Sequence, residues 1–196
     1  MAIILDGTTG ITAPDITSAA GLDAADLTGT VASARLPAGS VLQVVQTVKT
    51  DTSSVTGTAF VDVPNYSVTI TPQSTSNKIM VEVCLHVGEN QDAFPVFRMY
   101  RNGTELQIAS AISPGTSGMF GKTTTQNSSR DQYLIEPVNF KFLDTPNSTS
   151  AVTYTLKCRP FGVSAGRIIY FNRSQTVGDG NQYTVISTFT ATEIAG

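Results

Sequence analysis

Apolar and polar residues alternate along most of the chain from Val41 onward, with a period of two residues. Successive side chains of a β-strand point to opposite faces, so this period predicts strands that each bury one face. The clearest strand is Lys78–Val87. Its predicted inward face carries Ile79, Val81, Val83, Leu85 and Val87, and its other face carries Glu82, Cys84 and His86.

Several further segments show the same alternation. In Ala151–Arg159 the residues predicted to point inward are Val152, Tyr154, Leu156 and Cys158. The other predicted strands are Val41–Thr50, Phe60–Val63, Ser67–Thr71, Val96–Arg101, Glu105–Ala109, Val138–Phe142, Arg167–Phe171 and Gln182–Glu193. Asn102-Gly103 separates two of them and is a strong hairpin signal. Many short strands without an amphipathic helix predict an all-β body over residues 41–196, an antiparallel β-sandwich or jelly roll.

The first 40 residues follow neither the two-residue period of a strand nor the 3.6-residue period of a helix. Their apolar residues are about five apart, and turn-forming residues such as Gly, Pro, Asp and Thr lie between them. Such a segment buries too little to offset a backbone ordering cost of roughly 1–2 kcal/mol per residue. Residues 1–40 are therefore predicted to be an extended anchoring arm and linker that gains order from a partner. The residues predicted to dock are Ile3, Leu5, Ile11, Ile16, Leu22, Leu27, Val31 and Leu36.

Two stretches of the body carry apolar residues on both faces. One includes Phe94, Val96, Phe97, Met99 and Tyr100, and the other is Ile168–Phe171. Because a sandwich buries one face of each sheet, a second covered surface is expected there, provided by a subunit interface. The alternative is a strand that crosses the middle of the sandwich, or a β-bulge. The stretch Ser110–Arg130 is rich in Gly, Ser and Thr and is predicted to be a variable surface loop.

Composition narrows the classes of function. Charged residues make up 14% of the chain, and Ser and Thr provide most polar positions. The arm contains Asp6, Asp15, Asp23 and Asp26 against Arg35, which accounts for the formal net charge of −3. A neutral body argues against nucleic acid, whose phosphates need clustered Lys and Arg. The chain shows no signal-peptide pattern and no apolar run long enough for membrane insertion.

No catalytic, cofactor-binding or metal-binding constellation is visible in the sequence, so no enzyme is predicted. His86 is the single histidine, and with Glu89 it lacks the context of a nucleophile. Cys84 and Cys158 are expected to be buried free thiols, although a disulfide between them stays open. A hydrolase acting on surface polysaccharide would need clustered carboxylates between aromatic walls, and the acidic residues are dispersed.

The segments Ile3–Pro14 and Asp26–Pro37 resemble the amino-terminal stretch and linker of virion structural proteins of tailed bacteriophages, namely small tail fibres, head fibres and decoration proteins. Phe60–Pro64, Ser67–Pro72, Ser76–Ile79, Phe171–Ser174 and Ser187–Ile194 are similar to segments of their globular domains. The resemblance implies a component of the virion surface that is commonly homotrimeric and carries no catalytic residues or cofactor.

Pattern and resemblance together predict a trimeric fibre or spike, attached to other virion proteins of the tail or capsid by its arm. The exposed body is expected to contact a host cell-surface glycan or protein. The alternative is a capsid head fibre or decoration protein without an obligatory receptor. Receptor contact is expected in loops 110–130 and 172–181, with Tyr133 and Tyr170 as stacking residues. The residues predicted there are Ser117, Lys122, Asn127, Arg130, Arg173 and Asp179.

Overall fold

The structure of the protein is a computed structural model that describes residues 35–90, 93–110, 117–121, 131–160, 166–176, 178, 180 and 183–196. The chain divides after Arg35 into two units, Met1–Arg35 and Leu36–Gly196. Of the residues predicted to dock, Ile3, Leu5, Ile11, Ile16, Leu22, Leu27 and Val31 lie outside the described residues. Leu36 is described and is exposed.

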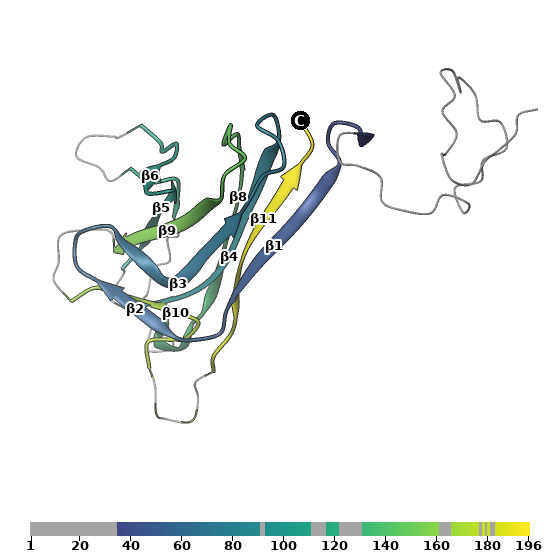
Figure 1. The fold of residues 1–196 in the computed structure, drawn as a ribbon. Coiled ribbons are helices and arrows are strands. Elements are labelled where there is room, and N and C mark those ends of the chain that lie inside the picture. The colour runs from purple at the N-terminus through teal and green to yellow at the C-terminus, as the bar shows by residue number, and fades with distance from the viewer. Residues whose placement is uncertain are drawn as a thin grey trace, which may run out of the picture. The chain divides into compact units, whose positions relative to one another are not determined.

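The described part of the body consists of two antiparallel sheets (Figure 1). Sheet A contains β1 (Val41–Lys49), β2 (Ser53–Thr56), β4 (Lys78–Glu89), β8 (Glu136–Asp144), β10 (Ile168–Phe171) and β11 (Ser187–Ile194). Sheet B contains β3 (Val61–Ile70), β5 (Pro95–Arg101), β6 (Thr104–Glu105), β7 (Phe120–Gly121) and β9 (Val152–Pro160). A short 3-10 helix, η3 (Asp131–Tyr133), precedes β8.

The chain crosses repeatedly between the two sheets. In sheet A, β10 and β11 pair end to end along one edge of β4, and β2 and β1 pair with them on the far side. β8 pairs with the other edge of β4. Along the chain, β1 and β2 belong to sheet A, β3 to B, β4 to A, β5 to β7 to B, β8 to A and β9 to B, and β10 and β11 return to the middle of sheet A. This order is that of a jelly roll, so the predicted all-β antiparallel fold is confirmed.

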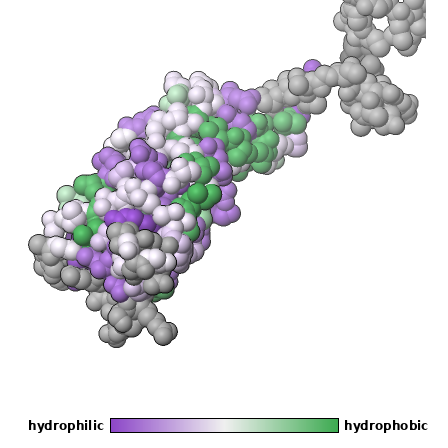
Figure 2. Space-filling view, turned by 90° about the horizontal axis from the view of Figure 1, so that it is seen from below, coloured by the Kyte–Doolittle hydropathy of each residue, from purple (hydrophilic) through white to green (hydrophobic). Residues whose placement is uncertain are grey.

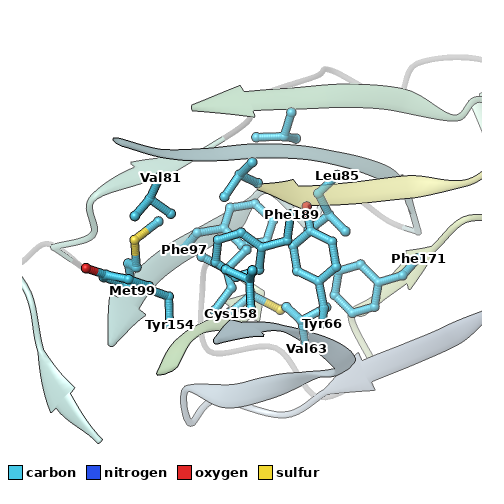
Figure 3. Close-up of a cluster of buried hydrophobic side chains, with 14 of the residues drawn as sticks. Val63, Tyr66, Val81, Leu85, Phe97, Met99, Tyr154, Cys158, Phe171 and Phe189 are labelled. Carbon is cyan, nitrogen blue, oxygen red and sulfur yellow. The ribbon is translucent and has the colours of Figure 1, made fainter. Parts of the chain in front are cut away.

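The inner faces of the two sheets form one hydrophobic core (Figure 3). The side chains predicted to point inward from β4 and β9 are buried, as the alternation requires. Tyr66 of β3 stacks on Phe189 of β11 with ring centroids 4.9 Å apart, which joins the two sheets. Burying each large apolar side chain stabilises the fold by roughly 1.5–3 kcal/mol.

The predicted hairpin turn is confirmed between β5 and β6. Asn102 and Gly103 have φ angles of 48° and 81°, as a type I′ turn requires. The second strand is shorter than the predicted Glu105–Ala109, because it ends at Glu105. The chain then turns away, and Ala109 N–H donates to the carbonyl of Gly118.

Three further strand predictions need correction. The run predicted over residues 182–193 forms a strand only from Ser187, since before it Thr184 makes an isolated bridge with Arg173. The two predicted segments 60–63 and 67–71 are one strand, β3, with an irregular register between Asp62 and Ser67. β2 and β7 were not predicted, because four and two residues are too few to show a period.

The two segments with apolar residues on both faces are covered within the body itself. In β10, Ile169 and Phe171 are fully buried on one side, and the Tyr170 ring on the other side lies under the Arg173 guanidinium. In β5, Val96 lies against β7 and Tyr100 lies under Lys157. Within the described residues, side chains of the body itself therefore lie against both faces of these two segments.

Asn172 lies between β10 and β11, the two strands that pair end to end along one edge of β4 in sheet A. It is fully buried with a φ of 59°, and its side-chain amide donates to the carbonyls of Lys49 and Asp51 at 2.9 and 3.0 Å. Ser187 donates its hydroxyl proton to the Asn172 side-chain oxygen. The amide thereby replaces the backbone pairing that is lost where β10 stops and β11 has not yet begun.

We predict that Asn172→Ala lowers the free energy of unfolding by about 3 kcal/mol, because two buried carbonyls and one hydroxyl lose their partner. Urea denaturation monitored by circular dichroism measures the change. Ser67→Ala, at an exposed position of β3, is the control and is expected to shift it by less than about 0.5 kcal/mol. Equal effects of the two substitutions would contradict this role of Asn172.

Candidate interaction surfaces

The buried charged residues of the body have structural partners. The Lys49 side chain is 0% exposed, and its Nζ lies 2.9 Å from Asp51 Oδ2 and 2.8 Å from the carbonyl oxygen of Pro64. The hydrogen bond from Lys49 lowers the pKa of Asp51. Lys49 therefore ties the end of β1 to the irregular part of β3.

Glu193 of β11 is also fully buried. Its carboxylate accepts hydrogen bonds from the Gln73 backbone N–H and the Asn77 side-chain amide, both at 2.6 Å, and from the Gln43 amide. These donors lie in β1 and in the turn between β3 and β4. Since a buried carboxylate needs such partners, Glu193 holds this turn against β1 and β11.

The sequence candidates for chemistry do not come together. His86 points outward from β4 and Glu89 inward, where it accepts from the Phe94 N–H at 2.9 Å. Cys84 and Cys158 are both free thiols, since Cys84 points outward and Cys158 into the core. Burial raises the pKa of the Cys158 thiol. Among the described residues no group of three His, Cys, Asp or Glu side chains could hold a metal ion.

A basic and aromatic cluster lies on the outer face of sheet B. The Arg98 and Arg159 guanidinium carbons lie 4.1 and 5.7 Å from the centre of the Phe60 ring. Lys157 Nζ lies 4.7 Å from the centre of the Tyr100 ring. Arg98 and Lys157 are directly opposed on neighbouring strands, a like-charge arrangement that costs energy unless it is compensated.

Two carboxylates compensate this cluster incompletely. Glu105 accepts from Arg98 at 2.9 Å and from the Tyr100 hydroxyl at 2.7 Å, and Asp62 lies 3.9 Å from Lys157. The Nε atom of Arg159 is buried and has no hydrogen-bond partner within the described part of the chain. We call Phe60, Arg98, Tyr100, Lys157 and Arg159 the cationic cluster. Its chemistry suits a carboxylate or phosphate ligand with an apolar side.

Ser117, predicted as a receptor contact, lies at the edge of the cationic cluster. Its carbonyl oxygen accepts from both Nε and Nη2 of Arg98, at 3.0 and 2.9 Å. Phe120 in β7 stacks between Phe97 and Phe140. Part of the segment predicted as a variable loop is thus an edge strand packed on the core, and this corrects that prediction for residues 117–121.

Arg173, also predicted as a receptor contact, is half-buried on the Tyr170 ring at 4.2 Å. It donates to the carbonyl of Ser174 at 3.1 Å. Tyr170 is 8% exposed, so its ring is not free for the predicted stacking on a ligand. Tyr133 is half-buried in η3. The remaining predicted contacts, Lys122, Asn127, Arg130 and Asp179, lie outside the described residues.

The outer face of sheet A carries apolar side chains that the sequence analysis did not single out. Val41 and Val44 are each 59% exposed, Val48 is 46% exposed and Leu143 is 45% exposed. Figure 2 shows hydrophobic residues gathered in a band along the body. A signal was present in β1, since its valines occupy both faces of the strand and its outward face contains no charged residue.

No protein-family model matches the chain, and no curated protein matches it. In the part of the chain that the structure describes, no helix has the length and apolar character needed to cross a bilayer.

We predict that Asp51→Asn lowers the free energy of unfolding by about 2 kcal/mol at pH 7, because the buried Lys49 ammonium loses its carboxylate. The pKa of Asp51 is lowered in the folded state, so its contribution is complete above the unfolded pKa of about 3.9 and is lost as the pH falls below it. The difference between wild type and variant should therefore shrink at pH 3.

Urea denaturation at pH 7 and pH 3 measures both values. Asp62→Asn serves as the control, because Asp62 is 64% exposed and 3.9 Å from Lys157. It should change stability by less than about 0.5 kcal/mol at either pH. The interpretation fails if Asp51→Asn behaves like this control.

Proposed function

We propose that the chain is a virion structural protein of a tailed bacteriophage, forming a homotrimeric fibre or spike on the particle surface. Residues 1–40 anchor it to tail or capsid proteins, and the jelly-roll body contacts the host surface. No membrane insertion, nucleic acid or cofactor is part of this proposal.

The division of the chain after Arg35 carries the proposal. It separates the segment with spaced apolar residues from a body whose inner faces already pack against each other. A segment whose apolar residues are spaced too widely to form a core of its own needs another surface to become ordered. The resemblance of residues 3–14 and 26–37 to virion structural proteins supplies the class of partner.

The cationic cluster supports a role in host contact. Cell-surface polysaccharides of bacteria present carboxylates, phosphates and apolar sugar faces, and Arg, Lys and aromatic rings bind these groups. The body is otherwise nearly neutral and rich in Ser and Thr, which limits nonspecific attraction to charged surfaces. The alternative, a head fibre or decoration protein, uses the same anchor but needs no ligand on this cluster.

We predict that deleting residues 2–36 leaves a folded body that no longer joins particles. Among the described residues the buried hydrophobic core begins at Val55 and Val45 packs against it, so a deletion that ends at Leu36 should leave the circular-dichroism spectrum and the thermal midpoint close to those of the full chain. Purified particles are assayed for the protein by mass spectrometry, and gold labelling of complete particles shows whether it lies on the tail or the capsid. Normal incorporation of the truncated chain would overturn the anchoring role.

We also predict that Lys157→Ala with Arg159→Ala weakens binding to host cells at least ten-fold, since two cations that face the ligand are lost. A fluorescently labelled full-length protein is titrated onto the cells at low and moderate salt. Ser67→Ala, at an exposed position of β3 outside the cationic cluster, is the control and should bind like wild type. Unchanged binding of the double variant would remove this cluster from host contact.

A further inference from the structure

We infer that the outer face of sheet A is the surface through which copies of this chain pack against one another. The inference rests on the proposed homotrimer and specifies which part of the body forms it. We call this surface the association face. Its outward apolar side chains are Val41, Val44, Val48, Met80, Cys84, Leu143 and Ile194.

The two outer faces of the sandwich differ in composition. Cross-strand register in sheet A places Val44, Thr192, Met80 and Leu143 in one row across β1, β11, β4 and β8. The outward residues of sheet B are mostly Ser, Thr, Lys and Arg, such as Ser67, Thr155 and Lys157. An antiparallel sheet that faces water on one side normally has polar residues there. Sheet B follows this rule. Sheet A follows it in β11, whose outward residues include Thr188, Thr190 and Thr192, but departs from it at Val44, Val48, Met80 and Leu143.

β1 is an edge strand with little of the usual protection against association. Natural edge strands carry Lys, Pro or bulges that prevent pairing with other chains. The register of β1 is irregular only between Val41 and Gln43, and its only charged residue, Lys49, points into the body and is buried. The edge strand β3 of sheet B contains Pro64 as well as an irregular register. An exposed valine-rich edge is tolerable where another chain covers it.

The charges of the association face favour a copy of itself over a charged partner. Glu82 and Lys141 lie opposite each other on β4 and β8 and form an ion pair. Lys78 is the remaining full charge on this face within the described strands. The face is thus close to neutral, so in a closed ring of three copies the same face of a neighbour can lie beside it without strong repulsion.

The area of the association face and the hollow in its surface also suit a second copy of the chain. Four strand columns spaced about 4.8 Å apart and roughly nine residues long give a face of roughly 600 Å². This is near the roughly 800 Å² that each partner buries in a standard interface. A hollow of about 250 Å³ lies in the face, lined by Glu82, Cys84, Asn139, Lys141, Thr188 and Thr190. It has room for an apolar side chain that projects from the same face of a neighbour, such as Leu143.

The first test is the mass of the full-length protein in solution. We expect wild type to sediment with a mass that is a multiple of the 20.7 kDa chain. The protein concentration below which the oligomer dissociates should be at least 100-fold higher for Val44→Asp than for wild type. Ser67→Asp places the same charge on an exposed position of an edge strand in sheet B and should assemble like wild type. Circular dichroism verifies that both variants fold, as their exposed positions lead us to expect.

The second test uses the two native thiols. Cys84 lies in the hollow and Cys158 lies in the core. In the assembled wild type, a maleimide should leave both thiols largely unmodified. In Val44→Asp it should modify Cys84 but not Cys158, and the rate of Cys84 modification should be at least ten-fold higher than in wild type. Modification of both thiols would indicate that the variant is unfolded and not only dissociated. In that case the experiment is repeated with Leu143→Asp, which lies on the opposite edge of the face.

The outcomes separate this inference from the proposed function. The association face is overturned if wild type is an oligomer and both Val44→Asp and Leu143→Asp keep the same mass. It is also overturned if Cys84 reacts as fast in the wild-type oligomer as in the variants. Either result leaves the oligomer itself in place. A monomeric wild type overturns both the face and the trimer. Neither result bears on whether the chain is part of a particle, which the mass spectrometry and labelling decide.

Discussion

Contact between the inner faces of the two sheets is the constraint on which the rest of the body depends. Neither sheet can bury its apolar side chains alone, and strands from both meet in pairs such as Tyr66 and Phe189. The Tyr66 hydroxyl donates to the Thr188 carbonyl at 2.6 Å, so even its polar atom is satisfied inside this contact. Everything that the outer faces present to other molecules is positioned by this packing.

The jelly-roll order creates a problem that polar side chains solve. β10 and β11 share one column of sheet A but are separated by residues 172–186. The gap leaves carbonyl groups of the neighbouring strand unpaired, and Asn172 satisfies those of Lys49 and Asp51. Lys49 and Glu193 play comparable parts at the ends of β1 and β11. The buried polar groups are therefore best understood as substitutes for missing strand pairing.

The period of two residues was enough to predict the long strands and their inward faces, because β4 and β9 alternate without interruption. It could not predict β2 or β7, which are shorter than a recognisable pattern, nor the partner of each strand in the sheets. The surfaces were less accessible to prediction. Ser117 was chosen for its loop composition, but its place beside Arg98 depends on pairing between β5 and β7, which are far apart in sequence. The sequence of β1 places valines on both faces of the strand, but which of them are exposed follows only from its inward-pointing Lys49 and its pairing with β11.

The two ends of the body meet in space. Gly39 N–H donates to the Ala195 carbonyl, and Ala195 N–H donates to the Ser40 carbonyl, both at 2.8 Å. A peptide linker of a few residues could therefore close the body into a ring without disturbing either sheet. New termini opened at the exposed Asn102-Gly103 turn would then give a circularly permuted protein with the same core. The order in which the strands are synthesised would change, while the sandwich that they build would not.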